Sequence, residues 1–259
     1  MELSIFQVDA FSQRVFGGNP AAICPLDSWL PDATLQAIAA ENNLAETAYF
    51  VRTGGRYHLR WFTPAVEMDL CGHATLASAH ILFHELGETG EAVRFDTQSG
   101  ELVVKRSGDL LVMDFPSRPP GVVAVPPELV PAIGGKPLEI LGARDYFVVY
   151  ETAEEVLALK PNMEALKGID KFAFIATARG RDCDFVSRFF APGAGVPEDP
   201  VTGSAHCSLI PYWAAKLGKA TLHARQISAR GGELFCKLEG DRVEIAGHCA
   251  FYLKGKIWV

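Results

Sequence analysis

The sequence has no long hydrophobic run, no excess of positive charge and no closely spaced pair of cysteines. No apolar stretch approaches the roughly 18–20 residues of a membrane-spanning helix, and the start MELSIFQVDAF lacks the basic and apolar regions of a secretory signal. Asp and Glu number 31 against 24 Lys and Arg, which gives a net charge of −7. Because phosphate binding needs clustered basic side chains, we expect no nucleic-acid partner. Since the sequence has neither an apolar run of spanning length nor a secretory signal at its start, we expect a cytoplasmic protein without a membrane partner.

The six cysteines are scattered, without a CxxC pair or zinc-type spacing. A chain of 259 residues, 49% of them apolar, can build a large core, so we expect free thiols rather than a disulfide framework. His80 and His84 have the i, i+4 spacing of a helical metal site, but the glutamate of an HExxH motif is missing. No glycine-rich segment has the spacing of a phosphate or dinucleotide loop. We therefore expect no metal and no organic cofactor.

An internal repeat runs through the chain. The segment VEMDLCGHATLASAHILFHELG (66–87) resembles VPEDPVTGSAHCSLIPYWAAKLG (196–218), with the two glycines at 72 and 203 separated by 131 residues. Further along, SGELVVKRSGDLLV (99–112) matches GGELFCKLEGDRVE (231–244) at an offset of 132. The near-constant offset indicates two similarly built halves.

The repeat predicts two domains joined by a proline-rich linker at 116–131. We place the N-terminal lobe at 1–117 and the C-terminal lobe at 118–249, with the last strand, 250–259, as a candidate to complete the first lobe. A small ligand is expected in the active-site cleft between two such lobes.

Each half is predicted to hold one apolar helix among strands. Residues 75–86 are apolar almost all round and stop at Gly87, while the second half repeats the pattern at 204–217. Pro211 within that second helix predicts a kink or a local break. Because a helix without a polar face must be enclosed by other structure, we predict an α+β fold of two similar lobes, each with sheets wrapped around a central helix.

The starts of these helices are candidate anion sites. Gly72 and Gly203 each follow an acidic segment and each precede a polar residue. Glycine lets a ligand approach the backbone, and the first N–H groups of a helix favour a negative charge. Ordinary turn and cap residues are the alternative explanation, but the symmetry of the repeat favours a pair of sites for a small carboxylic acid.

Glu46 is a candidate acid/base residue. It lies where a helical pattern gives way to the strand pattern TAYFV, amid apolar neighbours. Burial there would raise the pKa of its carboxyl group and suit general acid/base chemistry, although a solvated glutamate at a helix end is the alternative. The roles of His73 and Asp199 also have two explanations. Each can be a site residue, but a histidine near a helix start can instead be a cap or packing residue, and Asp-Pro is a common turn.

Five segments together resemble one known family. They are VDAFSQRVFGGNPAA, NNLAETAYF, RWFTPAVEMDLCGHATLASA, RFFAPGAGVPEDPVTGSAH and RGGEL, and they span nearly the whole chain. The combination is similar to the PhzF-like isomerases, named for phenazine biosynthesis, which have the diaminopimelate epimerase fold. The resemblance implies two lobes, each a curled, mostly antiparallel sheet or barrel around a central helix, in agreement with the repeat.

The resemblance also implies a reaction and its residues. Glu46 would be the acid/base that moves a proton on carbon, with His73 and Asp199 as further catalytic residues. The residues implied to bind the substrate are Asn19, Gly72, Thr202, Gly203 and Ser204. The family is not known to need a metal or an organic cofactor, and its phenazine enzyme isomerises a dihydro-hydroxyanthranilate by a proton shift. We therefore expect a cofactor-independent isomerase of a small carboxylic acid and, by resemblance, a homodimer.

One position departs from the epimerase relatives. Those enzymes use two cysteines, each just before a helix-start glycine, whereas this chain has Cys71 and Thr202. A hydroxyl group is too weak an acid to replace a thiol, which disfavours epimerisation by two thiols. Cys71 is either a reactive thiol activated by the helix start or a buried apolar residue. Two other functions stay open: an epimerase or racemase using Glu46 with Cys71 or His73, and a binding protein without turnover.

Overall fold

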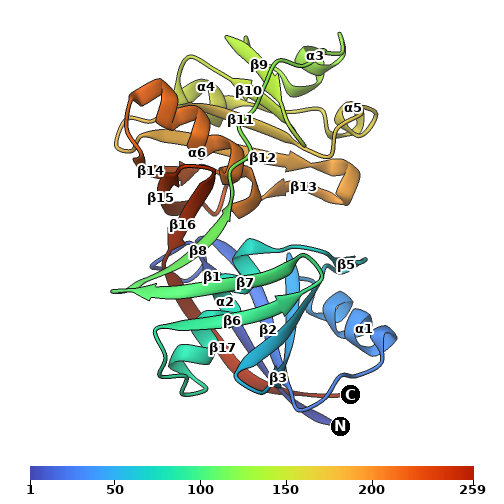
Figure 1. Ribbon diagram of the computed structural model, residues 1–259. Coiled ribbons are helices and arrows are strands. Elements are labelled where there is room, and N and C mark those ends of the chain that lie inside the picture. The colour runs from blue at the N-terminus through green and yellow to red at the C-terminus, as the bar shows by residue number, and fades with distance from the viewer. The chain divides into compact units, whose positions relative to one another are not determined.

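The computed structural model describes residues 1–259 and divides into two compact units. The N-terminal unit comprises residues 1–114 and 246–259, and the C-terminal unit comprises residues 115–245. Each unit combines parallel and antiparallel strand pairs with a few helices, which confirms the predicted α+β class (Figure 1). None of the helices is long and apolar enough to cross a membrane.

The N-terminal unit holds two helices and most of its strands in the first part of the chain. Its elements are β1 (Glu2–Ala10), β2 (Asn19–Leu26), α1 (Asp32–Asn42), β3 (Glu46–Thr53), β4 (Arg56–Phe62), β5 (Glu67–Met68), α2 (Gly72–His84), β6 (Ala92–Thr97), β7 (Gly100–Ser107), β8 (Leu110–Pro116) and β17 (Cys249–Trp258). The sheet order is β17-β1-β2-β3-β4-β6-β7-β8, in which only β2–β3 and β4–β6 are parallel pairs. The last strand of the chain therefore pairs with the first, from Glu2 opposite Trp258 to Ala10 opposite Cys249.

The C-terminal unit holds most of the shorter helices. Its elements are α3 (Leu129–Ile133), β9 (Glu139–Gly142), β10 (Tyr146–Val149), α4 (Ala153–Ala158), α5 (Met163–Lys167), β11 (Phe174–Arg179), β12 (Phe185–Ala191), the 3-10 turn η1 (Pro192–Ala194), β13 (Val196–Asp199), α6 (Gly203–Leu217), β14 (Thr221–Gln226), β15 (Gly232–Glu239) and β16 (Arg242–Gly247). Strands pair in the order β9-β10-β11-β12-β14-β15, with β10–β11 and β12–β14 parallel.

The strands of the two units repeat the same succession of pairings, which confirms the two similar lobes. In the N-terminal unit, β2, β3, β4, β6 and β7 pair in turn as parallel, antiparallel, parallel and antiparallel neighbours. In the C-terminal unit, β10, β11, β12, β14 and β15 follow the same sequence. The short strands β5 and β13 pair with β4 and β12, respectively, directly before the helices α2 and α6.

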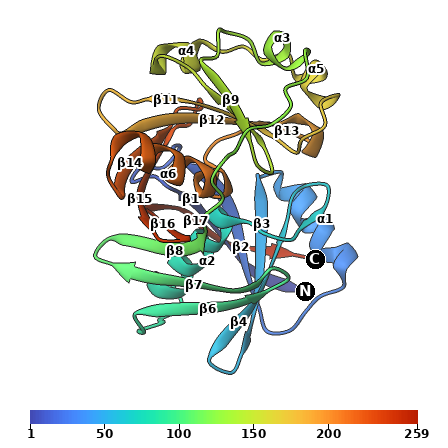
Figure 2. The ribbon, with the colours of Figure 1, turned by 45° about the horizontal axis from the view of Figure 1, so that its top comes forward.

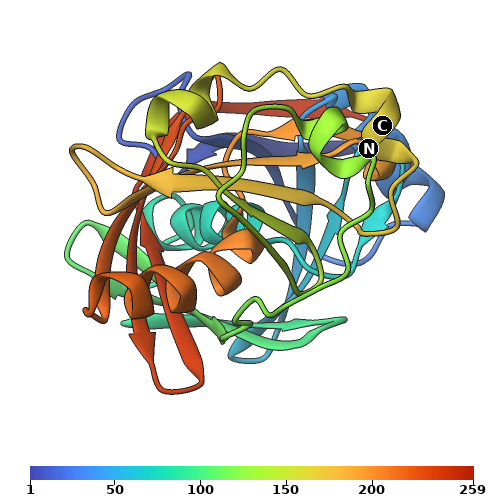
Figure 3. The same ribbon diagram turned by 90° about the horizontal axis from the view of Figure 1, so that it is seen from above.

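Helix α2 is enclosed by its own unit. It contacts β1, β2, β3, β7 and β17, and every residue from His73 to Phe83 except His80 is buried. Figure 3 shows this helix amid the strands of the N-terminal unit. Enclosure explains why its sequence has no polar face, since each side of the helix meets a strand rather than water.

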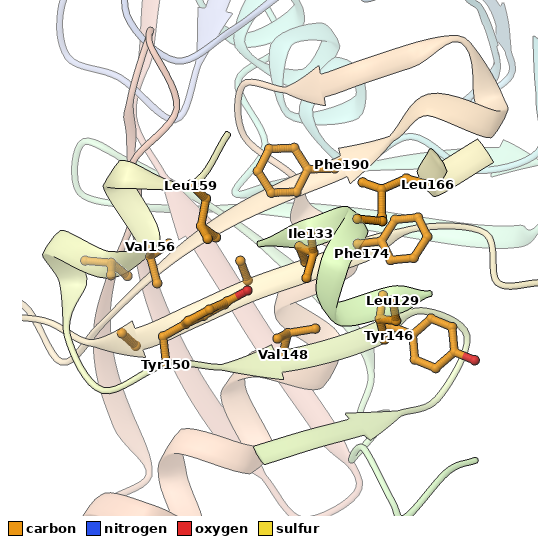
Figure 4. Close-up of a cluster of buried hydrophobic side chains, with 14 residues drawn as sticks. Leu129, Ile133, Tyr146, Val148, Tyr150, Val156, Leu159, Leu166, Phe174 and Phe190 are labelled. Atoms are coloured by element: carbon orange, nitrogen blue, oxygen red, sulfur yellow. The ribbon is translucent and has the colours of Figure 1, made fainter. Parts of the chain in front are cut away.

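The helices of the C-terminal unit cover both faces of its sheet. On one face, Ile133, Val156 and Leu166 from α3, α4 and α5 join a cluster with strand residues such as Phe174 (Figure 4). Side chains alternate along a strand, so Thr177 on β11 points to the opposite face. There it accepts a hydrogen bond of 3.0 Å from Trp213 of α6. Figure 2 shows α3, α4 and α5 along one side of β11 and β12.

Two details of the predicted helices need correction. The helices begin at Gly72 and Gly203, so both glycines are themselves helical residues rather than residues before the helix. A kink or a local break was predicted at Pro211; helix α6 continues past it to Leu217, so the break does not occur. Buried residues on both sides of the proline, among them Ile210 and Trp213, hold the helix together by packing although one backbone hydrogen bond is lost.

Candidate functional site

Glu46 stands at the predicted junction of a helix and a strand. Helix α1 ends at Asn42, and Asn43 follows in the left-handed conformation at φ 49°, which reverses the chain direction at low steric cost for asparagine. Glu46 then begins β3 and pairs with Ala21 of the parallel strand β2. Its side chain is only 14% exposed, so the carboxylate lies mostly away from water.

The carboxylate of Glu46 faces the imidazole of His73. Oε2 of Glu46 lies 2.9 Å from Nε2 of His73, and the histidine side chain is 6% exposed. The two atoms are at ion-pair distance, but they are not aligned for a hydrogen bond and make none to other groups. Oε2 and Nε2 are therefore both available to a bound molecule.

The other ring nitrogen of His73 faces two polar groups. Nδ1 lies 3.2 Å from Nδ2 of Asn19, the first residue of β2, and 3.5 Å from Sγ of Cys71, the residue before α2. Glu46, Cys71 and Asn19 thus surround one imidazole from three separate segments of the N-terminal unit.

Burial and neighbouring charges set the protonation of this group. Burial by itself lowers the pKa of His73, but its interactions with Cys71 and with the Glu46 carboxylate raise the pKa by more than burial lowers it. The pKa of His73 therefore lies well above its ordinary value. Burial raises the pKa of Cys71, and the Glu46 charge adds to the effect. The Glu46 carboxylate thus favours the protonated form of the imidazole, and burial favours the protonated thiol, as expected for the buried apolar alternative rather than the activated thiol.

A second polar group lies at the start of α6 in the C-terminal unit. Oδ2 of Asp199 accepts a hydrogen bond of 2.5 Å from the Thr202 hydroxyl group. Gln226 is buried at the end of β14. Its Oε1 atom accepts a hydrogen bond of 2.8 Å from the backbone N–H of Thr202, and its Nε2 atom donates one of 2.8 Å to the backbone carbonyl oxygen of Asp199. Gln226 therefore holds the turn between β13 and α6 through both the oxygen and the nitrogen of its side-chain amide.

Sequence reasoning did not single out Gln226, although one signal was present. The strand TLHARQ alternates between exposed and inward positions, and Gln226 falls on the same face as Leu222 and Ala224. A polar side chain at an inward strand position requires hydrogen-bond partners, so its position alone indicates a structural or functional task.

Neither helix start is closed by the side chain before it. Cys71 and Thr202 occupy the positions before α2 and α6, and neither side chain forms a capping hydrogen bond to its helix. The first residues of the helices are Gly72 and Gly203, and Ser204 follows the second. Uncapped helix starts keep backbone donors for another acceptor.

The predicted site residues form two groups, one in each unit. The group of the N-terminal unit contains Asn19, Glu46, Gly72 and His73, together with Cys71. The group of the C-terminal unit contains Asp199, Thr202, Gly203 and Ser204. His80 and His84 lie apart from both groups; their rings are 4.5 Å apart on α2, and burial lowers the pKa of His80 to about 4.

The chain matches a family model described as Phenazine biosynthesis-like protein over residues 8–255. Two relatives from Pseudomonas aeruginosa, each named an uncharacterized isomerase, are 54% identical over 257 and 258 residues and cover 99% of both chains. The phenazine biosynthesis-like domain-containing protein of Homo sapiens is 41% identical over 286 residues, with 99% of each chain covered.

Solved structures agree with the sequence relatives. A protein of the PhzF family from Enterococcus faecalis has a TM-score of 0.98 and 45% identity, with 100% of both chains covered. A hydroxyproline epimerase from Agrobacterium vitis has a TM-score of 0.63 at 11% identity, covering 99% of this chain and 92% of the other, and shares the fold alone. The resemblance seen in the sequence is confirmed: the chain belongs to the phenazine biosynthesis-like, or PhzF, family and is an isomerase.

Proposed function

We propose that this isomerase moves a proton between carbon atoms of a small carboxylic acid, with Glu46 as general acid/base and without an organic cofactor. The observation that carries the proposal is the 2.9 Å approach of the Glu46 carboxylate to the His73 imidazole in a mostly buried setting. An acid/base pair held away from water, whose facing atoms Oε2 and Nε2 make no hydrogen bond, is suited to proton transfer on carbon.

In the proposed reaction, the carboxylate of Glu46 takes a proton from a carbon next to an unsaturated system. The electron pair of the broken C–H bond moves into that system and leaves a delocalised anion. The His73 cation stabilises this anion because both lie in a region with little water. Protonated Glu46 then returns a proton to a different carbon, which completes the isomerisation and restores the starting protonation of the pair. If His73 donates the proton instead, the proton on Glu46 passes to His73 across their 2.9 Å contact and restores the same state.

The substrate carboxylate is proposed to bind at the helix starts. Gly72 precedes His73 directly, so an anion at the start of α2 would lie next to the acid/base pair. For the second group we propose that Asp199, Thr202, Gly203 and Ser204 bind other polar parts of the substrate. The hydrogen bonds from Gln226 to the turn before α6 support this assignment, because they hold Asp199 and Thr202 in one arrangement.

An epimerase or racemase is the second candidate, and the geometry favours it less. Such an enzyme needs an acid and a base on opposite faces of one carbon atom. Glu46 and His73 are in direct contact at 2.9 Å, which leaves no space for a carbon between them. The remaining pairing, Glu46 with Cys71, is disfavoured because burial raises the pKa of the thiol, so that little of the thiolate that would act as the base is formed at neutral pH.

The test is deuterium incorporation from solvent into a panel of small carboxylic acids, including dihydro-hydroxyanthranilate and several amino acids. The Glu46→Gln variant is compared with wild type and with Glu41→Gln, an exposed glutamate on α1. Exchange at one carbon that disappears only in Glu46→Gln supports the proposal. Saturable binding of a compound without exchange in any protein would indicate a binding protein instead.

A further inference from the structure

The two central helices contain the same side-chain contact one turn after their starts. In α2, Oγ1 of Thr75 donates a hydrogen bond of 2.5 Å to the backbone carbonyl oxygen of Cys71. In α6, Nδ1 of His206 lies 2.8 Å from the backbone carbonyl oxygen of Thr202. Both side chains are buried, and in both helices the acceptor is the residue directly before the first helical one. Two chemically different side chains therefore make one contact at equivalent positions of the repeat.

The surroundings of His206 show that its ring is a neutral donor. A carbonyl oxygen only accepts hydrogen bonds, so Nδ1 carries the hydrogen atom. Nε2 is buried without a hydrogen-bond partner, and burial lowers the pKa of the ring to about 4. The imidazole therefore does at the start of α6 what the hydroxyl group of Thr75 does at the start of α2.

A hydrogen bond to a carbonyl oxygen also orients the N–H group of the next residue. The peptide unit is planar and trans, so its C=O and N–H groups point in opposite directions and can only turn together. The residues that follow Cys71 and Thr202 are Gly72 and Gly203, and glycine has no Cβ to restrict the rotation of this unit. The donors on the two carbonyl oxygens therefore restrain a peptide plane that glycine alone would restrain little.

We propose that Thr75 and His206 are positioning residues for the substrate. Each holds the carbonyl oxygen before its helix and thereby aims the first N–H group of the helix at a substrate carboxylate. The inference rests on the proposed function, since it takes the helix starts as the places where the substrate binds. A second feature at α2 points to a ligand there. Nε2 of His73, the residue after Gly72, is buried without a hydrogen-bond partner.

A control for this role lies one turn further along α2. Buried hydroxyl groups in helices commonly donate to the carbonyl oxygen four residues earlier, whether or not a site is near. Ser78 does so, with a hydrogen bond of 2.7 Å to the carbonyl oxygen of Ala74. That carbonyl group lies inside the helix rather than before Gly72. Ser78→Ala therefore removes the same kind of hydrogen bond from the same helix without releasing the peptide unit at the helix start.

The test uses acetate as a carboxylate probe, so that it does not depend on the isomerase reaction. Acetate is titrated into the isotope-labelled protein while NMR follows the amide signals of Gly72 and Gly203, and wild type should show saturable shifts of both. Thr75→Val replaces the hydroxyl group by a methyl group. The acetate affinity at Gly72 should then fall about five- to tenfold, as for one hydrogen bond of usual strength. Thr75→Ser keeps the donor and should restore the affinity, and Ser78→Ala should leave it unchanged.

A matched pair of variants tests the start of α6. His206→Leu removes the donor, whereas His206→Asn places an amide nitrogen near the position of Nδ1. The acetate affinity at Gly203 should fall in His206→Leu and should be higher in His206→Asn, while the signal of Gly72 responds as in wild type. Urea denaturation shows that each variant is folded under the conditions of the titration.

The outcomes separate the positioning role from the proposed reaction. Absence of acetate binding at the helix starts of wild type, or equal losses in Thr75→Val and Ser78→Ala, would overturn the positioning role even if Glu46 exchanges deuterium. Absence of exchange with every compound would contradict the proposed reaction and leave the acetate result standing. With a substrate that does exchange, Thr75→Val should raise KM about five- to tenfold and leave kcat nearly unchanged, the signature of lost uniform binding.

Discussion

The guanidinium group of Arg188 donates two charge-assisted hydrogen bonds, at 2.7 and 2.8 Å, to the two carboxylate oxygens of Glu198. The other half of the chain contains the same pair: Arg60 donates to both oxygens of Glu67, also at 2.7 and 2.8 Å. In each unit the pair joins the strand β4 or β12 to the short strand that leads into the central helix. Both units therefore contain a bidentate Arg–Glu ion pair shortly before the central helix, and the pair Arg188–Glu198 is called the clamp below.

Removing the clamp should destabilise the C-terminal unit. Arg188 is 12% exposed and Glu198 is 25% exposed, so the pair lies mostly out of water. Arg188→Gln should lower the free energy of unfolding by about 1.5–3 kcal/mol, the usual range for hydrogen bonds to charged groups. Arg188→Lys should recover only part of this loss, because an ammonium group cannot make the bidentate contact.

Urea denaturation of Arg188→Gln, Glu198→Gln and the double variant measures the coupling between the two residues. As a control, Glu164→Gln removes a salt bridge with Lys167 whose partners are 81% and 48% exposed, and it should change stability by less than about 1 kcal/mol. Equal losses in the two single variants that simply add in the double variant would show that the clamp does not act as a pair.

Gln226 should influence substrate binding through the turn that it holds. Gln226→Leu leaves the buried N–H of Thr202 without its acceptor, a change that costs about 1–3 kcal/mol. Because Asp199 and Thr202 are proposed to bind substrate, KM should rise more than kcat falls. Gln226→Glu keeps the acceptor and should restore stability better than leucine does. A variant with lower kcat and unchanged KM would contradict the proposed positioning role.

His73 should be needed for catalysis as much as Glu46 is. Replacing it by Asn removes the imidazole beside the carboxylate, and exchange should slow by about 100- to 10,000-fold, the range for lost acid/base groups. His58→Asn, on β4 outside the group of site residues, is the control. Exchange within tenfold of wild type in His73→Asn would assign the whole proton transfer to Glu46.

Stability should fall as the pH is lowered below about 6.5. Burial lowers the pKa of both His80 and His206 to about 4 in the folded state, whereas a histidine in the unfolded chain titrates near 6.5. Between these values the unfolded state binds more protons, so its population grows. The stabilising contribution is therefore complete above pH 6.5 and is lost progressively between pH 6.5 and 4, at about 1.4 kcal/mol per pH unit for each group at most.

Urea midpoints recorded at pH 7, 6, 5 and 4.5 measure this slope. His80→Leu removes one of the two titrating groups and should flatten the dependence by about half, while His84→Leu should have a smaller effect. A slope that is the same in wild type and His80→Leu would show that other groups cause the acid sensitivity.

The residue pattern alone was sufficient for the repeat, the α+β class and the two central helices. These features depend on local periodicity and burial, since an apolar helix without a polar face must be enclosed wherever it lies. The sequence also predicted the position of Glu46 between a helix and a strand, because the hydrophobic period changes there from that of a helix to that of a strand. The family resemblance named His73 as its companion without indicating how the two side chains meet.

Only the tertiary structure decided which groups meet. Glu46 and His73 are far apart in the sequence and come together because β3 and the start of α2 belong to one enclosed unit. The contact of Cys71 with the same imidazole and the buried task of Gln226 depend on packing and strand register, which a local pattern does not specify. The last strand was expected to complete the first lobe, but its partner β1 came only from the structure, because hydrogen bonding in a sheet depends on spatial neighbours rather than on sequence distance.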